Sequence, residues 1–155
     1  IGNRIFLDYK LEALKGKDIQ VAVLLLDIDY FKDINDKFGH DMGDEILVAI
    51  SETIQNFCRK SDIFARIGGE EFVILSMSST EESAYFFADR VRGCVEDMSR
   101  TFESTITTSI GVALGNMKEV IFDELYKAAD VALYLAKSQG RNRAALYPKT
   151  DYQSK

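Results

Sequence analysis

Apolar residues repeat along the chain with two different spacings, and this alternation predicts a mixed α and β domain. Nearly continuous apolar runs rich in Val and Leu indicate strands buried on both faces. Apolar residues three and four positions apart indicate the buried stripe of a helix. We therefore expect helices over 4–14, 30–37, 44–58, 80–98 and 122–138, and strands over 19–28, 63–67, 72–77, 105–114 and 144–147.

Glycines and small polar residues separate these elements. Gly68-Gly69 lies between two short strands and predicts a hairpin turn. Ser79 or Thr80 is positioned to cap the helix that follows, and Gly140 to end the last helix. The glycine-containing stretch 38–43 is expected to be irregular and to precede a helix that begins at Asp44.

The order of elements predicts an α+β fold. Its centre reads βαββαβ, the ferredoxin-like or palm arrangement, with a mainly antiparallel central sheet. An extra helix precedes this core, and a helix with a short strand follows it. We expect the hairpin to lie in the centre of the sheet beside the first strand, which brings Asp27 close to Glu70 and Glu71.

These three carboxylates are candidate metal ligands. An unpaired carboxylate at the end of a buried strand is costly, and converging carboxylates repel one another unless a cation lies among them. Oxygen ligands suit Mg²⁺, and two such ions can hold both the attacking and the leaving oxygen of a phosphoryl displacement. The pattern alone leaves open the alternative that Glu70 and Glu71 are solvated turn residues.

Composition narrows the class of protein. The chain has 155 residues, 46% of them hydrophobic, which suits a single domain over 1–155. A net charge of −6 argues against a nucleic acid polymer as partner. No apolar run approaches membrane-helix length, so we expect no membrane contact by this segment. Cys58 and Cys94 are expected to be free core thiols in a reducing, cytoplasmic setting. The first residue is Ile1 and not an initiating Met, so we expect a piece of a longer protein. Whether that longer protein is anchored in a membrane is left open by the sequence.

Five ordered blocks resemble the GGDEF family of diguanylate cyclase domains. Residues 68–72 read GGEEF, a form of the family signature, and residues 27–36 read DIDYFKDIND. The other blocks are FGHDMGD, TSIGVA, and the late helix ADVALYLAK followed by GRN, at 38–44, 108–113, and 129–142. The resemblance extends from about residue 3 to 147 and implies the palm fold that the element order predicts.

The resemblance implies a metal site and a catalytic base. It implies Asp27, Glu70, Glu71 and the Ile28 carbonyl as ligands of two Mg²⁺ or Mn²⁺ ions per GTP. Glu70 would also deprotonate the ribose 3′-hydroxyl, and Lys32 would stabilise transition-state charge on the phosphates. Asp29 is excluded from this set, because we expect it to cap the short helix that follows.

Substrate contacts follow from the same resemblance. Asn35 and Asp44 would hydrogen-bond guanine, and a carboxylate that accepts from guanine N1–H and N2–H₂ rejects adenine. The amides of Tyr30 and Phe31 would hold phosphate oxygens. Lys137 and Arg141, four residues apart and expected on one helix face, would reach the terminal phosphates, although solvated helix-end residues are the alternative. His40 is the last candidate substrate contact, because it lies near the proposed base pocket. The alternative is a structural role, which is more common for a lone histidine beside glycine.

A second site is implied by residues 59–62, which read RKSD and resemble the family's RxxD inhibitory site. Arginine can donate to guanine O6 and N7 while aspartate accepts from another edge. Arg59 and Asp62, with Arg90 from the next helix, would bind cyclic di-GMP as product and inhibitor.

The function predicted on this resemblance is condensation of two GTP into cyclic di-GMP and two pyrophosphates, across a homodimer. One alternative is a catalytically silent receptor for GTP or cyclic di-GMP, although such members typically carry a broken signature. Another is a mononucleotide cyclase or polymerase-like nucleotidyltransferase, which the acidic charge disfavours where a polymer template is needed.

Overall fold

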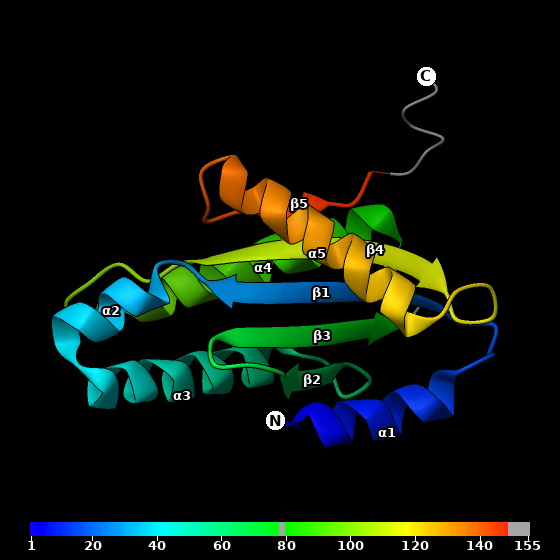
Figure 1. Cartoon of the computed structure of the whole chain (residues 1–155), viewed down its shortest axis with the longest axis horizontal. Helices are drawn as coiled ribbons and strands as arrows, with labels where there is room; N and C mark the ends of the chain where they lie inside the picture. Colours follow the sequence, from blue (N-terminus) through cyan, green and yellow to red (C-terminus); the bar gives the residue numbers. More distant parts are fainter. Residues whose placement is uncertain (78–79, 149–155) are drawn as a thin grey trace.

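The computed structural model describes residues 1–77 and 80–148, and their elements follow the predicted order. Figure 1 shows them along one sheet. Their bounds are α1 (Arg4–Leu14), β1 (Gln20–Ile28), α2 (Phe31–Phe38), α3 (His40–Phe57), β2 (Ile63–Arg66), β3 (Glu71–Met77), α4 (Glu81–Met98), β4 (Thr108–Asn116), α5 (Phe122–Ser138) and β5 (Ala144–Leu146). A 3₁₀ turn, η1 (Ser99–Thr101), which the sequence pattern did not predict, follows α4.

The described strands form one sheet in the order β2-β3-β1-β4-β5, which confirms the palm-like α+β fold. Every neighbouring pair is antiparallel except β4 and β5. The expectation that the whole hairpin lies in the centre is wrong for β2, which is an edge strand. Only one strand of a hairpin can pair with β1, and β3 takes that place along its full length. The centre belongs to β1, whose residues 21–26 are all buried.

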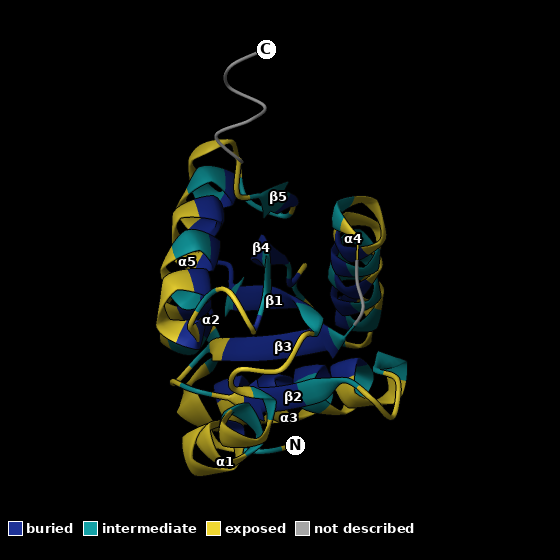
Figure 2. Cartoon of the chain, turned by 90° about the vertical axis from the view of Figure 1, so that its right-hand side faces the viewer, coloured by how far each residue is buried: buried dark blue, intermediate teal, exposed yellow. Residues whose placement is uncertain are grey.

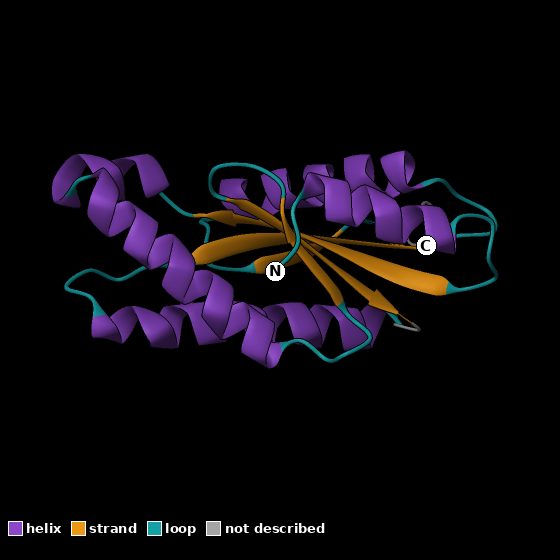
Figure 3. Cartoon of the chain, turned by 90° about the horizontal axis from the view of Figure 1, so that it is seen from below, coloured by secondary structure: helices purple, strands orange, loops and turns teal. Residues whose placement is uncertain are grey.

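Helices cover both faces of the sheet. Figure 2 shows α4 and α5 on opposite sides of it, and Figure 3 shows helices above and below the strands. Along β1, the side chains of Ala22, Leu24 and Leu26 pack with α3 and α4, whereas those of Val21, Val23 and Leu25 pack with α1 and α5. Because side chains alternate along a strand, Asp27 continues the second series and faces α5.

The helix α5 lies very close to β4. A Cβ atom added to Gly111 would lie 2.1 Å from the carbonyl oxygen of Ala129 and 2.3 Å from the amide nitrogen of Leu133. Glycine at this position therefore lets helix and strand backbones nearly touch. This close packing fixes where the carboxyl end of α5 lies relative to the end of β1.

The boundaries of α3 and β4 differ from those predicted. Helix α3 begins at His40 rather than Asp44, and Gly43 is buried inside it. Gly43 serves close packing rather than a turn, while the break before the helix is Gly39, with φ +88°. Strand β4 begins at Thr108 instead of 105 and continues to Asn116.

The start of α4 carries one of the two predicted caps. The Thr80 side chain accepts from the Ser83 amide, and the Ser83 side chain accepts from the Thr80 amide. Ser79, the alternative cap, lies outside the described residues. Cys58 and Cys94 are both free, as predicted. None of the helices in the described part of the chain combines the length and the apolar character needed to cross a membrane.

Candidate active site at the end of β1

Three acidic residues lie near one another where β1 ends and the β2–β3 hairpin turns. Asp27 is paired in register with Glu71, so both side chains lie on the same face of the sheet. The amide of Ile28 donates to the carbonyl of Glu70 at 3.3 Å. The predicted approach of Asp27 to Glu70 and Glu71 is confirmed.

This concentration of negative charge is unfavourable without a cation. Burial raises the pKa of Glu70, the negative charges of Asp27 and Glu71 raise it further, and Lys137 opposes them. Lys137 donates to Oδ2 of Asp27, forming an ion pair across 110 residues of sequence. Like charges directly opposite in a sheet destabilise it, so the site favours a positive partner.

The donors fit a divalent cation in their chemistry, although they are not gathered around one point. Asp27 Oδ1 is buried and has no hydrogen-bond partner among the described residues. An oxygen left in that condition costs free energy, and a cation would satisfy it. No group of three or more His, Cys, Asp or Glu side chains within 1–77 and 80–148 is arranged to hold a metal ion. The carboxylate of Glu71 lies instead toward Gly68, where an added Cβ would be 3.4 Å from Oε2.

The turn after β1 presents the amino end of α2. Tyr30 has a left-handed backbone, with φ 55°, and no side chain within the described chain caps this helix. The first amides of a helix lack intrahelical partners and attract anions. Phe31 is buried and anchors the helix, while Lys32 is exposed on it. This arrangement suits the predicted phosphate contacts of Tyr30, Phe31 and Lys32.

The expectation that Asp29 caps α2 is wrong. Asp29 is 5% exposed and accepts from the hydroxyls of Thr107 and Ser109, each at 2.7 Å. It also accepts from the amide of Asn142 at 3.0 Å. The reason is that Asp29 still lies beside the start of β4, where the hydroxyls of Ser109 and of Thr107, just before the strand, bind its carboxylate.

The predicted base-binding residues lie where α2 meets α3. Asn35 Oδ1 is buried and has no hydrogen-bond partner in the described part of the chain. A Cβ added to Gly43 would lie 1.9 Å from this oxygen, so the two helices leave room only for glycine there. Asp44 follows Gly43 and is exposed, and His40 is exposed as the first residue of α3. The structure thus brings Asn35 against Gly43, near the start of α3.

Lys137 and Arg141 reach the site by different routes, which corrects the prediction that they share a helix face. Helix α5 ends at Ser138, and Arg141 lies beyond it with a left-handed backbone, φ 65°. The Arg141 guanidinium stacks over the Tyr30 ring at 4.5 Å and donates to its hydroxyl at 3.4 Å. Lys137 therefore reaches β1 from the helix, and Arg141 covers the β1–α2 turn from the following loop.

The second predicted site gathers at the carboxyl end of α3. The amide of Arg59 donates to Asp62 Oδ2 at 2.8 Å, and its guanidinium donates to Ser76 at 3.3 Å. The Arg90 guanidinium lies 4.9 Å from the Phe57 ring, at the last residue of α3. Burial raises the pKa of the Cys58 thiol to about 12, with the Asp62 charge as a further cause. All three predicted residues therefore surround the same helix end.

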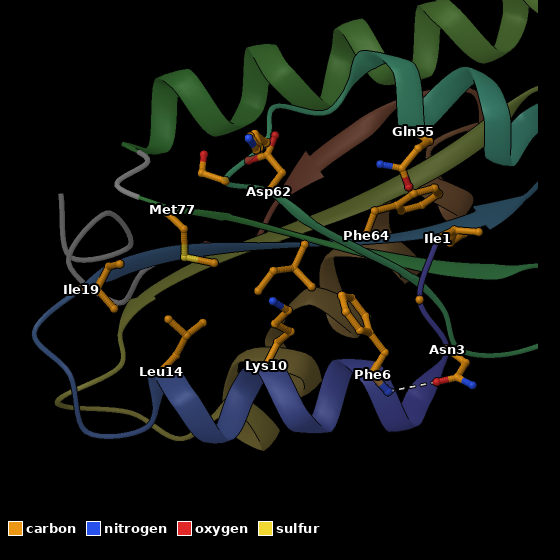
Figure 4. A pocket seen from close by; sticks show the side chains of 14 residues that line it. Ile1, Asn3, Phe6, Lys10, Leu14, Ile19, Gln55, Asp62, Phe64 and Met77 are labelled. Atoms are coloured by element: carbon orange, nitrogen blue, oxygen red, sulfur yellow. Dashed lines mark hydrogen bonds between the residues drawn. The ribbon is translucent and has the colours of Figure 1, made fainter.

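A pocket of about 700 Å³ borders this second site. Figure 4 shows it between α1, which contributes Phe6, Lys10 and Leu14, and the segment that carries Asp62 and Phe64. It lies away from the acidic end of β1. The sequence pattern gave no signal for it, because it depends on how α1 packs beside β2.

The unpartnered oxygens tie these observations together. Within the described residues, three buried side-chain oxygens or nitrogens have no hydrogen-bond partner: Asp27 Oδ1, Asn35 Oδ1 and Asp62 Oδ1. Each belongs to a residue that the sequence placed in a ligand site. Folded proteins rarely leave such groups unsatisfied, so a ligand or an ordered water would complete each of the three. By contrast, sequence reasoning missed Asn142, although its place after Gly140-Arg141 in a matching block was a signal.

The comparisons with known proteins show the family to which the chain belongs. Residues 1–143 match the family described as "Diguanylate cyclase, GGDEF domain". The diguanylate cyclase DgcM of Escherichia coli (strain K12) is 45% identical over 122 residues, which are 79% of this chain and 30% of DgcM. The chain thus spans less than a third of the length of that relative.

Two solved structures share the fold. The GGDEF domain of DgcB from Caulobacter crescentus, in complex with c-di-GMP, has a TM-score of 0.84 and 28% identity, covering 94% of this chain and 90% of that one. The active GGEEF domain of a diguanylate cyclase from Vibrio cholerae has a TM-score of 0.74 and 31% identity, covering 96% and 92%.

Proposed function

Because the chain belongs to the family of diguanylate cyclase GGDEF domains, we propose that it condenses two GTP molecules into cyclic di-GMP and two pyrophosphates. The observation that carries this proposal is the acidic end of β1. There Asp27, whose buried Oδ1 has no hydrogen-bond partner in the described residues, is paired in register with Glu71, next to Glu70. We also propose that residues 1–155 act as one catalytic domain, and that it works in the cytoplasm, where GTP is found.

Asp27, Glu70, Glu71 and the Ile28 carbonyl would hold two divalent ions, Mg²⁺ or Mn²⁺, per GTP. Such ions polarise the phosphoryl oxygens and stabilise the charge on the attacking and leaving oxygens. The Asp27 oxygen without a partner and the raised pKa of Glu70 support a cation at this place. With a cation bound at Asp27, Lys137 would be released from its ion pair and free to contact the terminal phosphates.

Glu70 is the proposed general base. It would accept the proton of the ribose 3′-hydroxyl at its carboxylate as that oxygen attacks the α-phosphate of the other GTP. A base is most effective when its pKa is close to the working pH. The burial and neighbouring charges that raise the pKa of Glu70 act in that direction.

Guanine recognition falls to Asn35 and Asp44, with His40 nearby. The Asn35 oxygen is buried without a partner in the described chain and would accept a hydrogen bond from the base. Asp44 would accept from guanine N1–H and N2–H₂, donors that adenine does not present together. A site that leaves a buried acceptor unpaired discriminates strongly against the wrong base.

The triphosphate would lie along the amino end of α2. The amides of Tyr30 and Phe31 would hold phosphate oxygens, Lys32 would stabilise transition-state charge, and Lys137 and Arg141 would bind the terminal phosphates. Their positions around one turn support this assignment. One domain binds one GTP, so two copies must meet for each 3′-hydroxyl to attack the other's phosphate.

Product inhibition is the proposed role of Arg59, Asp62 and Arg90. The unpartnered oxygen of Asp62 would accept from guanine, and the arginines would donate to guanine or to phosphate. The gathering of these residues around one helix end supports this role.

The test is a turnover assay on the chain at high concentration and after artificial dimerisation. We expect Mg²⁺-dependent conversion of GTP to cyclic di-GMP, identified by chromatography, with a rate that falls when cyclic di-GMP is added. If GTP binds and no product forms in either sample, the cyclase proposal fails. Binding of cyclic di-GMP without turnover would identify a receptor module, and a monomeric cyclic nucleotide product would identify a different cyclase.

A further inference from the structure

Left-handed backbone conformations gather at one place in the described chain. Tyr30, Arg141 and Asn142 are its non-glycine residues with positive φ, at 55°, 65° and 47°. Such conformations cost of order 1–2 kcal/mol for most residues and persist only where surrounding contacts hold them. Since Arg141 stacks on Tyr30, the three belong to a single unit at the β1–α2 turn.

Asp29 holds one side of this unit. Its Oδ2 accepts from the Asn142 amide at 3.0 Å and from the Thr107 hydroxyl at 2.7 Å. Its Oδ1 accepts from the Ser109 hydroxyl at 2.7 Å. Both oxygens of this buried carboxylate are thus satisfied, and they join the end of β1 to β4 and to the loop after α5.

Asn142 holds the other side through its side chain. Its Oδ1 accepts from Arg92 Nη1 at 3.0 Å, and its Nδ2 donates to Glu96 Oε2 at 2.9 Å. Arg92 in turn donates to Glu96 and to Asp89 on its own helix, α4. Asparagine is among the few residues that tolerate a left-handed backbone, so position 142 can bend the chain and bridge two elements at once.

We propose that Asp29 and Asn142 are positioning residues that hold Arg141 over the β1–α2 turn for contact with the terminal phosphates of GTP. The partly buried path of hydrogen bonds from α4 through Asn142 to Asp29 is called the Asp29–Asn142 link. It fixes the residues on both sides of the Arg141 stack, because Asp29 precedes Tyr30 and Asn142 follows Arg141. This inference rests on the proposed function, since it needs GTP in the site.

The test is a double-mutant cycle on the whole chain, read out by calorimetric binding of a non-hydrolysable GTP analogue and of GMP with Mg²⁺. Asn142→Gly removes the side-chain bonds while leaving the left-handed backbone unstrained. We expect it to weaken binding of the GTP analogue roughly tenfold or more, as misplacement of a binding group does. In an Arg141→Ala background the same change should cost less than about twofold, because coupled residues are not additive. GMP lacks the terminal phosphates, so its binding should change less than about twofold.

Asn116→Gly is the matched control. Asn116 lies opposite Gln20 at the other end of β1, where its Nδ2 donates to Asp18 at 2.8 Å and its Oδ1 accepts from the Lys118 amide. It should lower thermal stability without weakening binding of the GTP analogue. If Asn142→Gly does not fold, Asn142→Asp keeps the acceptor for Arg92 and removes the donor to Glu96.

The outcomes separate the two proposals. If Asn142→Gly costs as much in the Arg141→Ala background as alone, or weakens GMP equally, the link is merely structural and the positioning inference is overturned. If the unmutated chain does not bind the GTP analogue with any divalent metal ion, the proposed function itself fails and this inference fails with it.

Discussion

Asp27 and Asp62 have the same local design at two different places in the molecule. Each carboxylate has one oxygen held by a basic residue and one buried oxygen with no partner in the described residues. For Asp27 the basic partner is Lys137, and for Asp62 the partner is Arg59, through its amide at 2.8 Å and its Nε at 3.8 Å.

The surroundings of the two carboxylates differ in charge. Asp27 faces Glu70 and Glu71, whose charges add to its own. Asp62 lies between Arg59, whose side chain is 67% exposed, and the helix end at which Arg90 stacks on Phe57. The first environment favours a cation, and the second favours a ligand that offers a hydrogen-bond donor together with an acceptor or anion. At both places the charges around the unpartnered oxygen indicate which class of ligand would suit it.

The largest effect is expected from Glu71→Ala, which removes one carboxylate from the acidic site around Asp27. Loss of a metal ligand removes several kcal/mol of transition-state stabilisation, so turnover should fall roughly a thousandfold or more. Because Glu71 is exposed, circular dichroism and the melting temperature should change little. Turnover within tenfold of the unmutated chain would remove Glu71 from the metal site.

Gly43→Ala tests the third unpartnered oxygen, which belongs to an uncharged side chain. The added Cβ would lie 1.9 Å from Asn35 Oδ1 and must displace it. We expect the KM for GTP to rise roughly tenfold to a hundredfold, measured by steady-state kinetics. The matched control is Gly93→Ala, where an added Cβ meets nothing within 4 Å. That change should stabilise α4 by up to about 1 kcal/mol and leave the KM unchanged. An unaltered KM in Gly43→Ala would exclude Asn35 from base recognition.

Asp62→Asn tests the second of the two carboxylates, at the proposed inhibitory site. The amide replaces an acceptor with a donor, so the concentration of cyclic di-GMP that halves the rate should rise about tenfold or more. Initial rates at low conversion should stay near those of the unmutated chain, since Asp62 lies at a different helix end from the acidic site. Inhibition that is unchanged in this variant would place the inhibitory site elsewhere.

The smallest effect is expected on stability, for Glu70→Gln, in the pH dependence of unfolding without divalent cations; turnover should also fall, because Glu70 is the proposed general base. The pKa of Glu70 is raised in the folded state, so the folded chain binds its proton more tightly than the unfolded chain does. Stability is then lost as the pH rises from the unfolded value, 4.5, through the raised folded pKa. The Gln variant should lack this loss in urea unfolding series with a chelator. An identical pH profile in the two proteins would show that neither burial nor the neighbouring charges raise the pKa of Glu70.

Much of the fold followed from local pattern. The bounds of α1 and α5 agree with the apolar spacing, and the ten main elements occur in the predicted order. Boundaries failed where tertiary packing set them. Glycine is a residue type typical of turns, but Gly43 lies inside α3, where Asn35 packs against it. Aspartate just before a helix is typical of a helix cap, but the hydroxyls of Thr107 and Ser109 donate to Asp29 instead.

The candidate sites divide in the same way. The proximity of Asp27, Glu70 and Glu71 could be predicted from the sequence, because the order of the elements indicates which strands pair. The partners Lys137 for Asp27 and Asn142 for Asp29 are 110 and 113 residues away in sequence. No periodicity within one element reports such pairs.

The order and type of the elements, the two-sided burial of β1 and the acidic end of that strand could be predicted from the sequence alone, because the spacing of apolar residues and the order of the strands indicate them. Only the tertiary structure decided which oxygens remain without partners and which backbone segments are held in left-handed conformations. Those properties depend on atoms brought together by the packing of α5 on β4 and of α3 against α2. For Asp27 and Asp62 in particular, sequence supplied the carboxylates, and folding supplied the charges around them.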